Sequence, residues 1–257
     1  MLSLIQTAER TTNTLPVSNY VYQRHVFAYN SAIRYLGDNV VELGCGSGYG
    51  MQILAASCNW YVGLDKYIPD NRKADFNTAF FKARFPDLDN IGSNSFDTVI
   101  CFQVIEHVKE DQRFLKEAWR LLRPGGKLLL TTPNKLMSLT RNPFHIREYT
   151  PYNIRELIGS RFSRFDIQGV YGNDTVKEYY KANRRSVEKI LRWDVLNLQH
   201  RLPSALLKLP YNVLNNINRK LISNNDPERS AGISSADFYI DKVAGTCLDF
   251  FVVAEKE

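Results

Sequence analysis

The chain has 257 residues, of which 44% are hydrophobic, 12% aromatic and 23% charged. This composition excludes a largely disordered or fibrous chain. At this length we expect one domain, or one domain with an insertion, and a core that needs no disulfide bridges. No run of 18 apolar residues occurs, so the sequence predicts no membrane-spanning helix.

The net charge of +6 is confined to one segment. Between Gly172 and Ser223 there are ten Lys or Arg residues and four Asp or Glu residues, so the remainder of the chain is neutral overall. The basic balance is therefore a property of this segment and does not indicate a wholly basic nucleic-acid-binding protein.

The four cysteines, at positions 45, 58, 101 and 247, lie far apart and form no CxxC pair. This spacing favours a reducing compartment and no zinc knuckle. The first residues lead into a polar stretch rather than the apolar region of a signal peptide. We therefore expect a cytoplasmic protein.

Hydrophobic periodicity and turn residues predict alternating helices and strands. Helices are expected over residues 18–36 (with Ser18 as a cap), 51–56, 110–122 and 151–158, and strands over 39–43, 60–64, 78–82, 96–102, 127–132, 162–171 and 247–254. The alternation predicts an α/β fold with a mostly parallel seven-stranded sheet, whose last strand is antiparallel.

Four parts are expected along the chain: an N-terminal cap segment (1–37), a core (38–172), a basic helical insertion (173–235) and a final strand completing the sheet (236–257). In the insertion, apolar residues recur at three- and four-residue spacing and polar residues take the other face. The apolar positions are Leu207, Pro210, Leu214, Ile217 and Leu221.

The strongest motif is the glycine cluster at residues 44–50, directly after a predicted strand. Glycines there let the backbone turn sharply and approach a ligand closely, at the strand end where α/β sheets bind ligands. The pattern is GxGxG, preceded by the acid Glu42, which suits a ligand with a cationic tail rather than a pyrophosphate. Asp65 ends the next strand, the usual position of a carboxylate that binds a ribose diol. An adenosine with a cationic, phosphate-free tail is S-adenosylmethionine.

The run ELGCGSGYG, the strand-end Asp65, FDTVICFQVIEHV and LLRPGGKLLLTTPN together resemble the class I (Rossmann-like) S-adenosylmethionine-dependent methyltransferases. The resemblance covers residues 18–171 and the final strand. It implies S-adenosyl-L-methionine as cofactor and S-adenosyl-L-homocysteine as product. It also implies a cap helix within the stretch from Glu9-Arg10 to His25, for which an ordinary packing helix is the alternative.

The same resemblance implies roles for individual residues. Glu42 and the loop of Gly44, Cys45, Gly46 and Gly48 would hold the methionyl part, and Asp65 the ribose. Arg84 and Phe85 would flank the adenine, and Phe102 and Gln103 would lie beside the transferring methyl group.

A hydroxyl acceptor must lose a proton during methyl transfer, and three residues are candidates for this chemistry. His145 lies in the loop after the fifth strand and is the first choice for the general base. Glu106 and His107 lie just past the fourth strand and face the same cleft; they either take part or fix the loop geometry. An ordering role for His145 alone is the alternative.

The residues Gln103, Glu106, His107 and His145 also resemble the E-x-x-E-H … H metal-ligand set of small-RNA 2′-O-methyltransferases, part of which recurs in ubiquinone-pathway O-methyltransferases. Gln103 stands where the first acid belongs, and a neutral amide is a poorer ligand for Mg²⁺. We therefore assign no metal.

The whole layout is similar to bacterial methyltransferases that accompany surface-polysaccharide and glycolipid assembly. We therefore expect O-methylation of a sugar or small hydroxylated metabolite, as a free small molecule or a glycan- or lipid-linked acceptor. RNA 2′-hydroxyls, quinone-like phenols with metal assistance, and a non-catalytic cofactor-binding scaffold are the alternatives. The insertion is a lid, a helical subdomain, or a surface that docks residues 173–223 on the inner face of the membrane; its spread-out basic residues disfavour nucleic acid. The sequence does not determine the oligomeric state.

Overall fold

The computed structural model describes residues 19–67, 76–192, 194, 198–225 and 232–257. The chain divides into two compact units. The larger comprises Val26–Met137, Ile146–Tyr171 and Ile240–Glu257, and the smaller comprises the described parts of Met1–His25, Ser138–His145 and Gly172–Tyr239. The expected cap at Ser18 and the Glu9-Arg10 pair lie outside the described residues.

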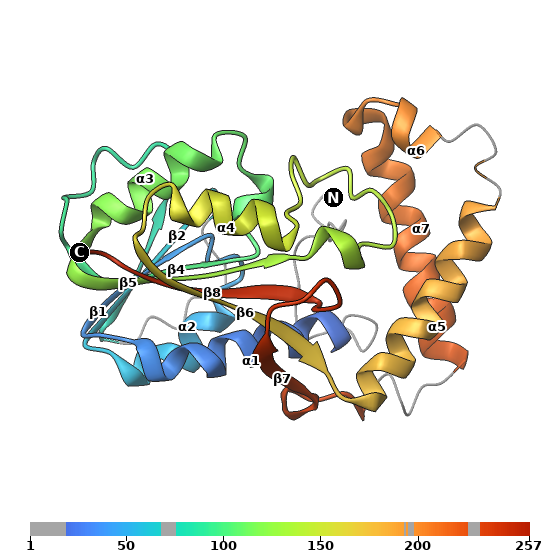
Figure 1. The fold of residues 1–257 in the computed structure, drawn as a ribbon, viewed down its shortest axis with the longest axis horizontal. Coiled ribbons are helices and arrows are strands. Elements are labelled where there is room, and N and C mark those ends of the chain that lie inside the picture. The colour runs from blue at the N-terminus through green and yellow to red at the C-terminus, as the bar shows by residue number, and fades with distance from the viewer. Residues whose placement is uncertain (1–18, 68–75, 193, 195–197, 226–231) are drawn as a thin grey trace. The chain divides into compact units, whose positions relative to one another are not determined.

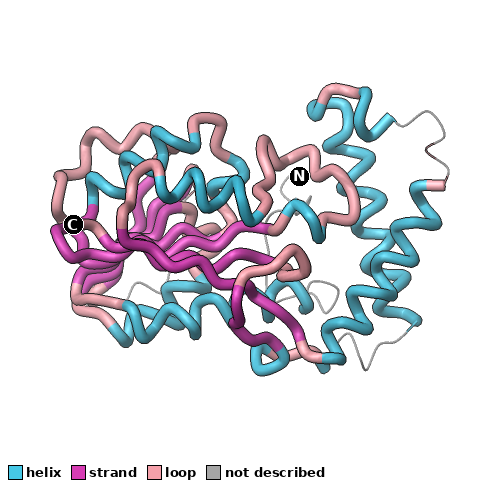
Figure 2. Tube along the Cα trace, viewed as in Figure 1, coloured by secondary structure: helices cyan, strands magenta, loops and turns pink. Residues whose placement is uncertain are grey.

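An eight-stranded sheet, in the order β3-β2-β1-β4-β5-β8-β6-β7, organises the larger unit (Figures 1 and 2). Its strands are β1 (Asn39–Leu43), β2 (Trp60–Asp65), β3 (Thr78–Lys82), β4 (Phe96–Phe102), β5 (Leu122–Pro133), β6 (Arg164–Gly172), β7 (Phe238–Lys242) and β8 (Asp249–Glu255). The predicted α/β fold with a mostly parallel sheet is confirmed. The short edge strand β7 is an addition to the seven expected strands.

The first five strands pair in parallel, and most residues of β1 and β4 are buried. Val41 of β1 stands opposite Val62 on one side and Val99 on the other, and both Val41 and Val99 are completely inaccessible to solvent. Strands covered on both faces read as continuous apolar runs, which is why these elements could be located from sequence.

β8 runs antiparallel to both of its neighbours, β5 on one side and β6 on the other. Leu129 of β5 lies opposite Val253, and Ile167 of β6 lies opposite Val252. β5 begins earlier than expected, because the Pro124-Gly125-Gly126 turn is taken into the strand as an irregularity, with a positive φ of 77° at Gly125.

Helices cover both faces of the sheet (Figure 1). α3 (Asp111–Leu121) and α4 (Pro151–Gly159) lie on one face, and α2 (Tyr49–Leu54) lies on the other with the larger unit's part of α1 (Asn19–Ala32). The 3₁₀ turns are η2 (Ile33–Tyr35), η3 (Ala55–Ser57), η4 (Ile105–His107), η5 (Lys135–Met137) and η6 (Ser235–Asp237). α4 begins where predicted because the Thr150 side chain caps it, accepting a hydrogen bond from the Asn153 backbone N–H at 3.2 Å.

The smaller unit is built on the helices of the insertion: α5 (Asp174–Leu191), α6 (Leu198–Arg201) and α7 (Ser204–Asn225). The Asn173 side chain caps α5, accepting from the Val176 N–H. α5 and α7 pack against each other, and the Asn218 amide donates to the Asn183 side-chain oxygen at 2.7 Å. Among the described residues, no helix is long and apolar enough to span a bilayer.

Gly50 offers a test of the packing between α1 and α2. A Cβ at Gly50 would lie 2.3 Å from the buried ring of Tyr29. We expect Gly50→Ala to lower the free energy of unfolding by about 1–3 kcal/mol, because overpacked cores must shift side chains or backbone. Urea unfolding measures the change.

Gly159→Ala is the matched control, since its Cβ would make only ordinary contacts, at 3.5 Å from Phe165. An equal free energy of unfolding for both variants would contradict the packing of Tyr29 on Gly50.

Candidate cofactor and catalytic site

The glycine loop after β1 depends on backbone conformations that favour glycine. Gly44, Gly46 and Gly48 have φ values of 85°, 55° and 81°. The beginning of the loop is hydrogen-bonded to β2: the N–H groups of Gly44 and Cys45 both donate to the Leu64 carbonyl oxygen, at 2.7 and 3.1 Å. A Cβ at Gly46 would meet nothing within 4 Å, so the loop leaves open space at its centre.

Asp65 at the end of β2 is tied to the same loop. One carboxylate oxygen accepts from the Gly46 N–H at 2.9 Å, and the other accepts from the Tyr67 N–H at 3.0 Å. Asp65 is half-buried, and a carboxylate is a group that accepts hydrogen bonds from ligand hydroxyls. The two predicted elements, the glycine loop and the strand-end acid, are therefore brought together.

Glu42 is completely buried at the carboxyl end of β1. Its two carboxylate oxygens accept short hydrogen bonds from two phenols, Tyr29 on one oxygen and Tyr61 on the other. Burial raises the pKa of Glu42, and the two phenolic hydrogen bonds act in the opposite direction. Glu42 therefore lies in the strand just before the loop, and each of its carboxylate oxygens is hydrogen-bonded to a tyrosine.

Tyr29 and Tyr61 are site residues that the sequence analysis did not identify. The β1–β2 register pairs Glu42 with Gly63, so Tyr61, two residues earlier, shares the face of Glu42. Tyr29 of α1 also contacts Tyr49 edge-on, with ring centroids 5.5 Å apart, and Phe102, at 5.0 Å. The register of the parallel strands is the signal that could have pointed to Tyr61.

The end of β4 approaches the same edge of the sheet. Phe102 is buried, and Gln103 directly after it has a φ of 56°, uncommon for a residue with a side chain. Gln103 is held by its N–H, which donates to the Thr131 carbonyl oxygen at 2.9 Å, and by its amide, which donates to the Thr131 hydroxyl at 3.3 Å. Backbone conformations of this kind cluster at functional sites.

The residues expected to flank adenine differ in their surroundings. Arg84 is exposed, whereas Phe85 packs edge-on against Phe114 of the core, with ring centroids 5.4 Å apart. Their place after β3 puts them at the correct edge of the sheet. The adenine contact itself stays a prediction.

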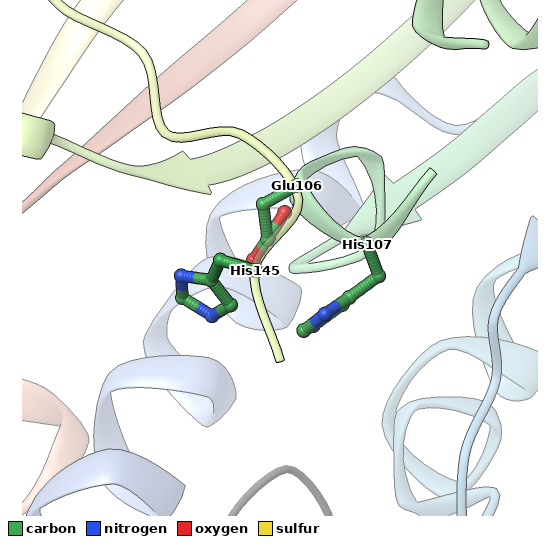
Figure 3. Close-up of side chains that lie close together, drawn as sticks. All are labelled: Glu106, His107 and His145. Carbon is green, nitrogen blue, oxygen red and sulfur yellow. The ribbon is translucent and has the colours of Figure 1, made fainter. Parts of the chain in front are cut away.

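Glu106, His107 and His145 form a cluster of titratable side chains (Figure 3). Each offers one ligand or proton-accepting atom, and these three atoms lie within 4.8 Å of one another. The backbone fixes the arrangement locally: the N–H groups of Ile146 and Arg147, which directly follow His145, donate to the Glu106 carbonyl oxygen at 2.8 and 3.2 Å. The cluster therefore joins η4 to the loop after β5.

The environment of Glu106 changes its acidity. The side chain is buried, and burial raises its pKa to about 7, partly offset by the neighbouring His107 and by the Thr132 hydroxyl that donates to it at 3.1 Å. Glu106 therefore titrates near neutral pH, while His107 and His145 are half-buried. The same three groups have the donor types to bind a divalent cation.

The loop carrying the cluster is fixed by the buried Asp111 at the start of α3. One oxygen of Asp111 accepts from both the Arg147 guanidinium and the Tyr149 hydroxyl. The hydrogen bond to Asp111 is the main cause of a raised pKa for Arg147. Sequence analysis missed this anchor, because Asp111 has the residue type and position of an ordinary first-turn helix acid.

A glycine loop and a strand-end carboxylate at the carboxyl edge of a parallel sheet define a protein that binds a nucleoside-type ligand. Comparison with known proteins narrows the class. The model of a family described as "Methyltransferase domain" matches residues 41–130. A probable S-adenosylmethionine-dependent methyltransferase of Mycolicibacterium smegmatis is 34% identical over 181 residues, 65% of this chain and 67% of that protein.

A relative of the same description from Mycobacterium tuberculosis is 32% identical over 170 residues, 60% of each chain. Among solved structures, a Haemonchus contortus phosphoethanolamine N-methyltransferase in complex with S-adenosylhomocysteine shares the fold, with a TM-score of 0.51 and 14% identity over 92% of this chain and 53% of that one.

The chain belongs to the S-adenosylmethionine-dependent methyltransferases, of the class I Rossmann-like type. Its residues fit the cofactor: the space at Gly46 is open, and the Asp65 carboxylate lies at the loop's edge. When bound, S-adenosylmethionine supplies a methyl group activated by its sulfonium. The assignment of single residues to parts of the cofactor stays a prediction.

Asp65 allows a direct test of the cofactor site. We expect Asp65→Ala to weaken S-adenosylmethionine binding by at least about tenfold, since hydrogen bonds to a charged group contribute about 1.5–3 kcal/mol each. Calorimetric titration measures the dissociation constant. Asp166→Ala, at an exposed position of β6, is the matched control. Equal affinities for the two variants would remove Asp65 from the cofactor site.

Glu106 predicts a pH dependence of stability. Its pKa is about 7 in the folded protein and near the ordinary value of 4.5 when unfolded. The unfolded carboxyl therefore loses its proton first, and its ionisation lowers the free energy of unfolding as pH rises from about 4.5 to 7, by up to about 3 kcal/mol. Glu106→Gln should lack this fall.

Urea unfolding of wild type and variant at pH 5 and 7.5 tests this, with Glu156→Gln at an exposed position of α4 as control. If the difference between wild type and Glu106→Gln does not change with pH, Glu106 has an unshifted pKa.

Proposed function

We propose that the protein transfers the methyl group of S-adenosylmethionine to a hydroxyl group of a sugar or small hydroxylated metabolite. The observation that carries the proposal is the Glu106–His107–His145 cluster, whose three functional atoms lie within 4.8 Å of one another. A hydroxyl group must lose its proton when its oxygen is methylated. The imidazole of histidine is the usual proton acceptor for such a step at neutral pH.

His145 is the general base of this proposal. It precedes Ile146, whose N–H is bound to the Glu106 carbonyl oxygen, so the imidazole is carried by a backbone segment held at two adjacent amides. A base must stand within hydrogen-bond reach of the proton that it takes, and an anchored loop lowers the entropy cost of that placement. Asp111 supports the same segment through Arg147 and Tyr149.

Glu106 is the group that receives the proton in the proposal, and His107 lies beside it. A carboxyl group with a pKa of about 7 is partly protonated at neutral pH, so it can take up or release a proton there. Its side chain is oriented by the Thr132 hydroxyl of β5. The proton removed from the acceptor thus reaches a group that can hold it.

The test is a product assay that detects S-adenosylhomocysteine release with a panel of sugars, phenols, thiols and amines. We expect turnover with hydroxylated acceptors. His145→Ala should lower kcat by about 10²–10⁴-fold while the dissociation constant of S-adenosylmethionine is unchanged, which is the range for a lost general base. His200→Ala, which removes a histidine from α6, is the matched control.

Three results would contradict the proposal. Turnover with thiols or amines alone would assign another acceptor class, and unchanged kcat in His145→Ala would remove the base. Loss of hydroxyl methylation in chelator, restored by Mg²⁺, would assign the cluster to a metal instead.

A further inference from the structure

Part of the polar side of α7 is buried. Asn212 and Asn218 are only 9% and 4% exposed, and the Asn218 amide donates to Asn183 of α5. Tyr211, the residue before Asn212, contacts Phe144, and their ring centroids lie 6.2 Å apart. The helix therefore uses asparagines and a tyrosine to pack within the smaller unit.

The opposite side of α7 carries apolar side chains exposed to solvent. Leu206, Leu209, Val213 and Ile217 are 63%, 66%, 50% and 46% exposed. Their spacing of three, four and four residues places them on one face of the helix, as a row about three turns long. Single exposed apolar residues are ordinary on protein surfaces, whereas a continuous row marks a contact surface.

Basic side chains stand at the end of the unit where this row begins. Lys189 lies in the last turn of α5, Arg192 directly follows that helix, and Arg201 ends α6. All three are exposed, and within the described part of the chain none is in an ion pair. Basic residues nearer the start of α5 are in ion pairs. Lys177, Lys181 and Arg184 pair with Asp174, Glu178 and Glu188, respectively.

We propose that the exposed face of α7, with these three basic residues, docks on the surface of a membrane that contains anionic lipids. A helix with an apolar row and basic flanks lies in the plane of the interface, with its apolar side among the acyl chains and its cations at the headgroups. α7 does not itself meet the requirements for spanning the bilayer.

The observations favour this occupant over the others. Nucleic acid would neutralise the cations but leave the leucines in water. A second copy of the chain would cover the apolar row but bring two positively charged segments together, since the 172–223 segment of each copy carries ten basic and four acidic residues. An anionic bilayer satisfies both the apolar and the charged groups.

Vesicle sedimentation of the full chain tests the proposal. We expect the wild type to sediment with phosphatidylcholine vesicles containing about a third phosphatidylglycerol, and not with pure phosphatidylcholine. Raising salt from about 0.1 to 0.5 M should weaken binding. The double variant Leu206→Ser, Val213→Ser should lower partitioning by at least about tenfold, since each loses a buried apolar side chain in the complex.

Trp60→Ser is the matched control, because it removes a larger exposed apolar side chain from β2 of the other unit. Circular dichroism and S-adenosylhomocysteine binding verify that each variant is folded. Equal partitioning of the double variant and the wild type, or no binding of the wild type to anionic vesicles, overturns the proposal. A wild-type dimer that the double variant converts to monomer also overturns it and assigns the row to a second copy.

Discussion

The buried carboxylate of Glu42, held between Tyr29 and Tyr61, is the interaction on which the cofactor end of the molecule depends. A carboxylate without access to solvent is costly unless its oxygens are hydrogen-bonded, and here each oxygen has a phenolic donor. The three side chains come from α1, β1 and β2, so one polar contact joins a helix to two adjacent strands. Removing either phenol would leave a buried oxygen without its donor.

The glycine loop begins two residues after Glu42 and is held on two sides. The loop is bound on the β2 side by the Leu64 carbonyl oxygen and the Asp65 carboxylate. On the α1 side, the ring of Tyr29 fills the place where a side chain at Gly50 would stand. The positive φ angles of Gly44, Gly46 and Gly48 therefore belong to a loop fixed on both sides, and only its centre is open to a ligand.

Sequence reasoning located the elements and motifs that a local pattern encodes. The parallel strands are continuous apolar runs, and the glycine cluster and Asp65 stand at fixed distances from strand ends. It could not find Tyr29 and Tyr61, because a buried tyrosine is counted among apolar residues until its hydroxyl is seen to have a partner. It also missed β7, whose five residues alternate too briefly to predict a strand.

The helix α7 illustrates a second limit. Its spacing shows an apolar face and a polar face, but the pattern does not say which is buried, and here Asn212 and Asn218 face inward. The proximity of His145 to Glu106 was expected from two loops at one sheet edge, yet the backbone bonds of Ile146 and Arg147 that fix it have no signature in the side-chain pattern.

We expect the Tyr29–Glu42–Tyr61 contact to shape the cofactor loop. Calorimetric titration of S-adenosylmethionine into Tyr29→Phe combined with Tyr61→Phe tests this most directly, because both rings keep their packing and only the two hydroxyls are lost. We expect a folded protein whose affinity for S-adenosylmethionine falls by at least about tenfold, since an unsatisfied buried carboxylate costs more than about 1.4 kcal/mol. An affinity equal to that of the wild type would contradict it and show that the loop holds its shape without the buried contact.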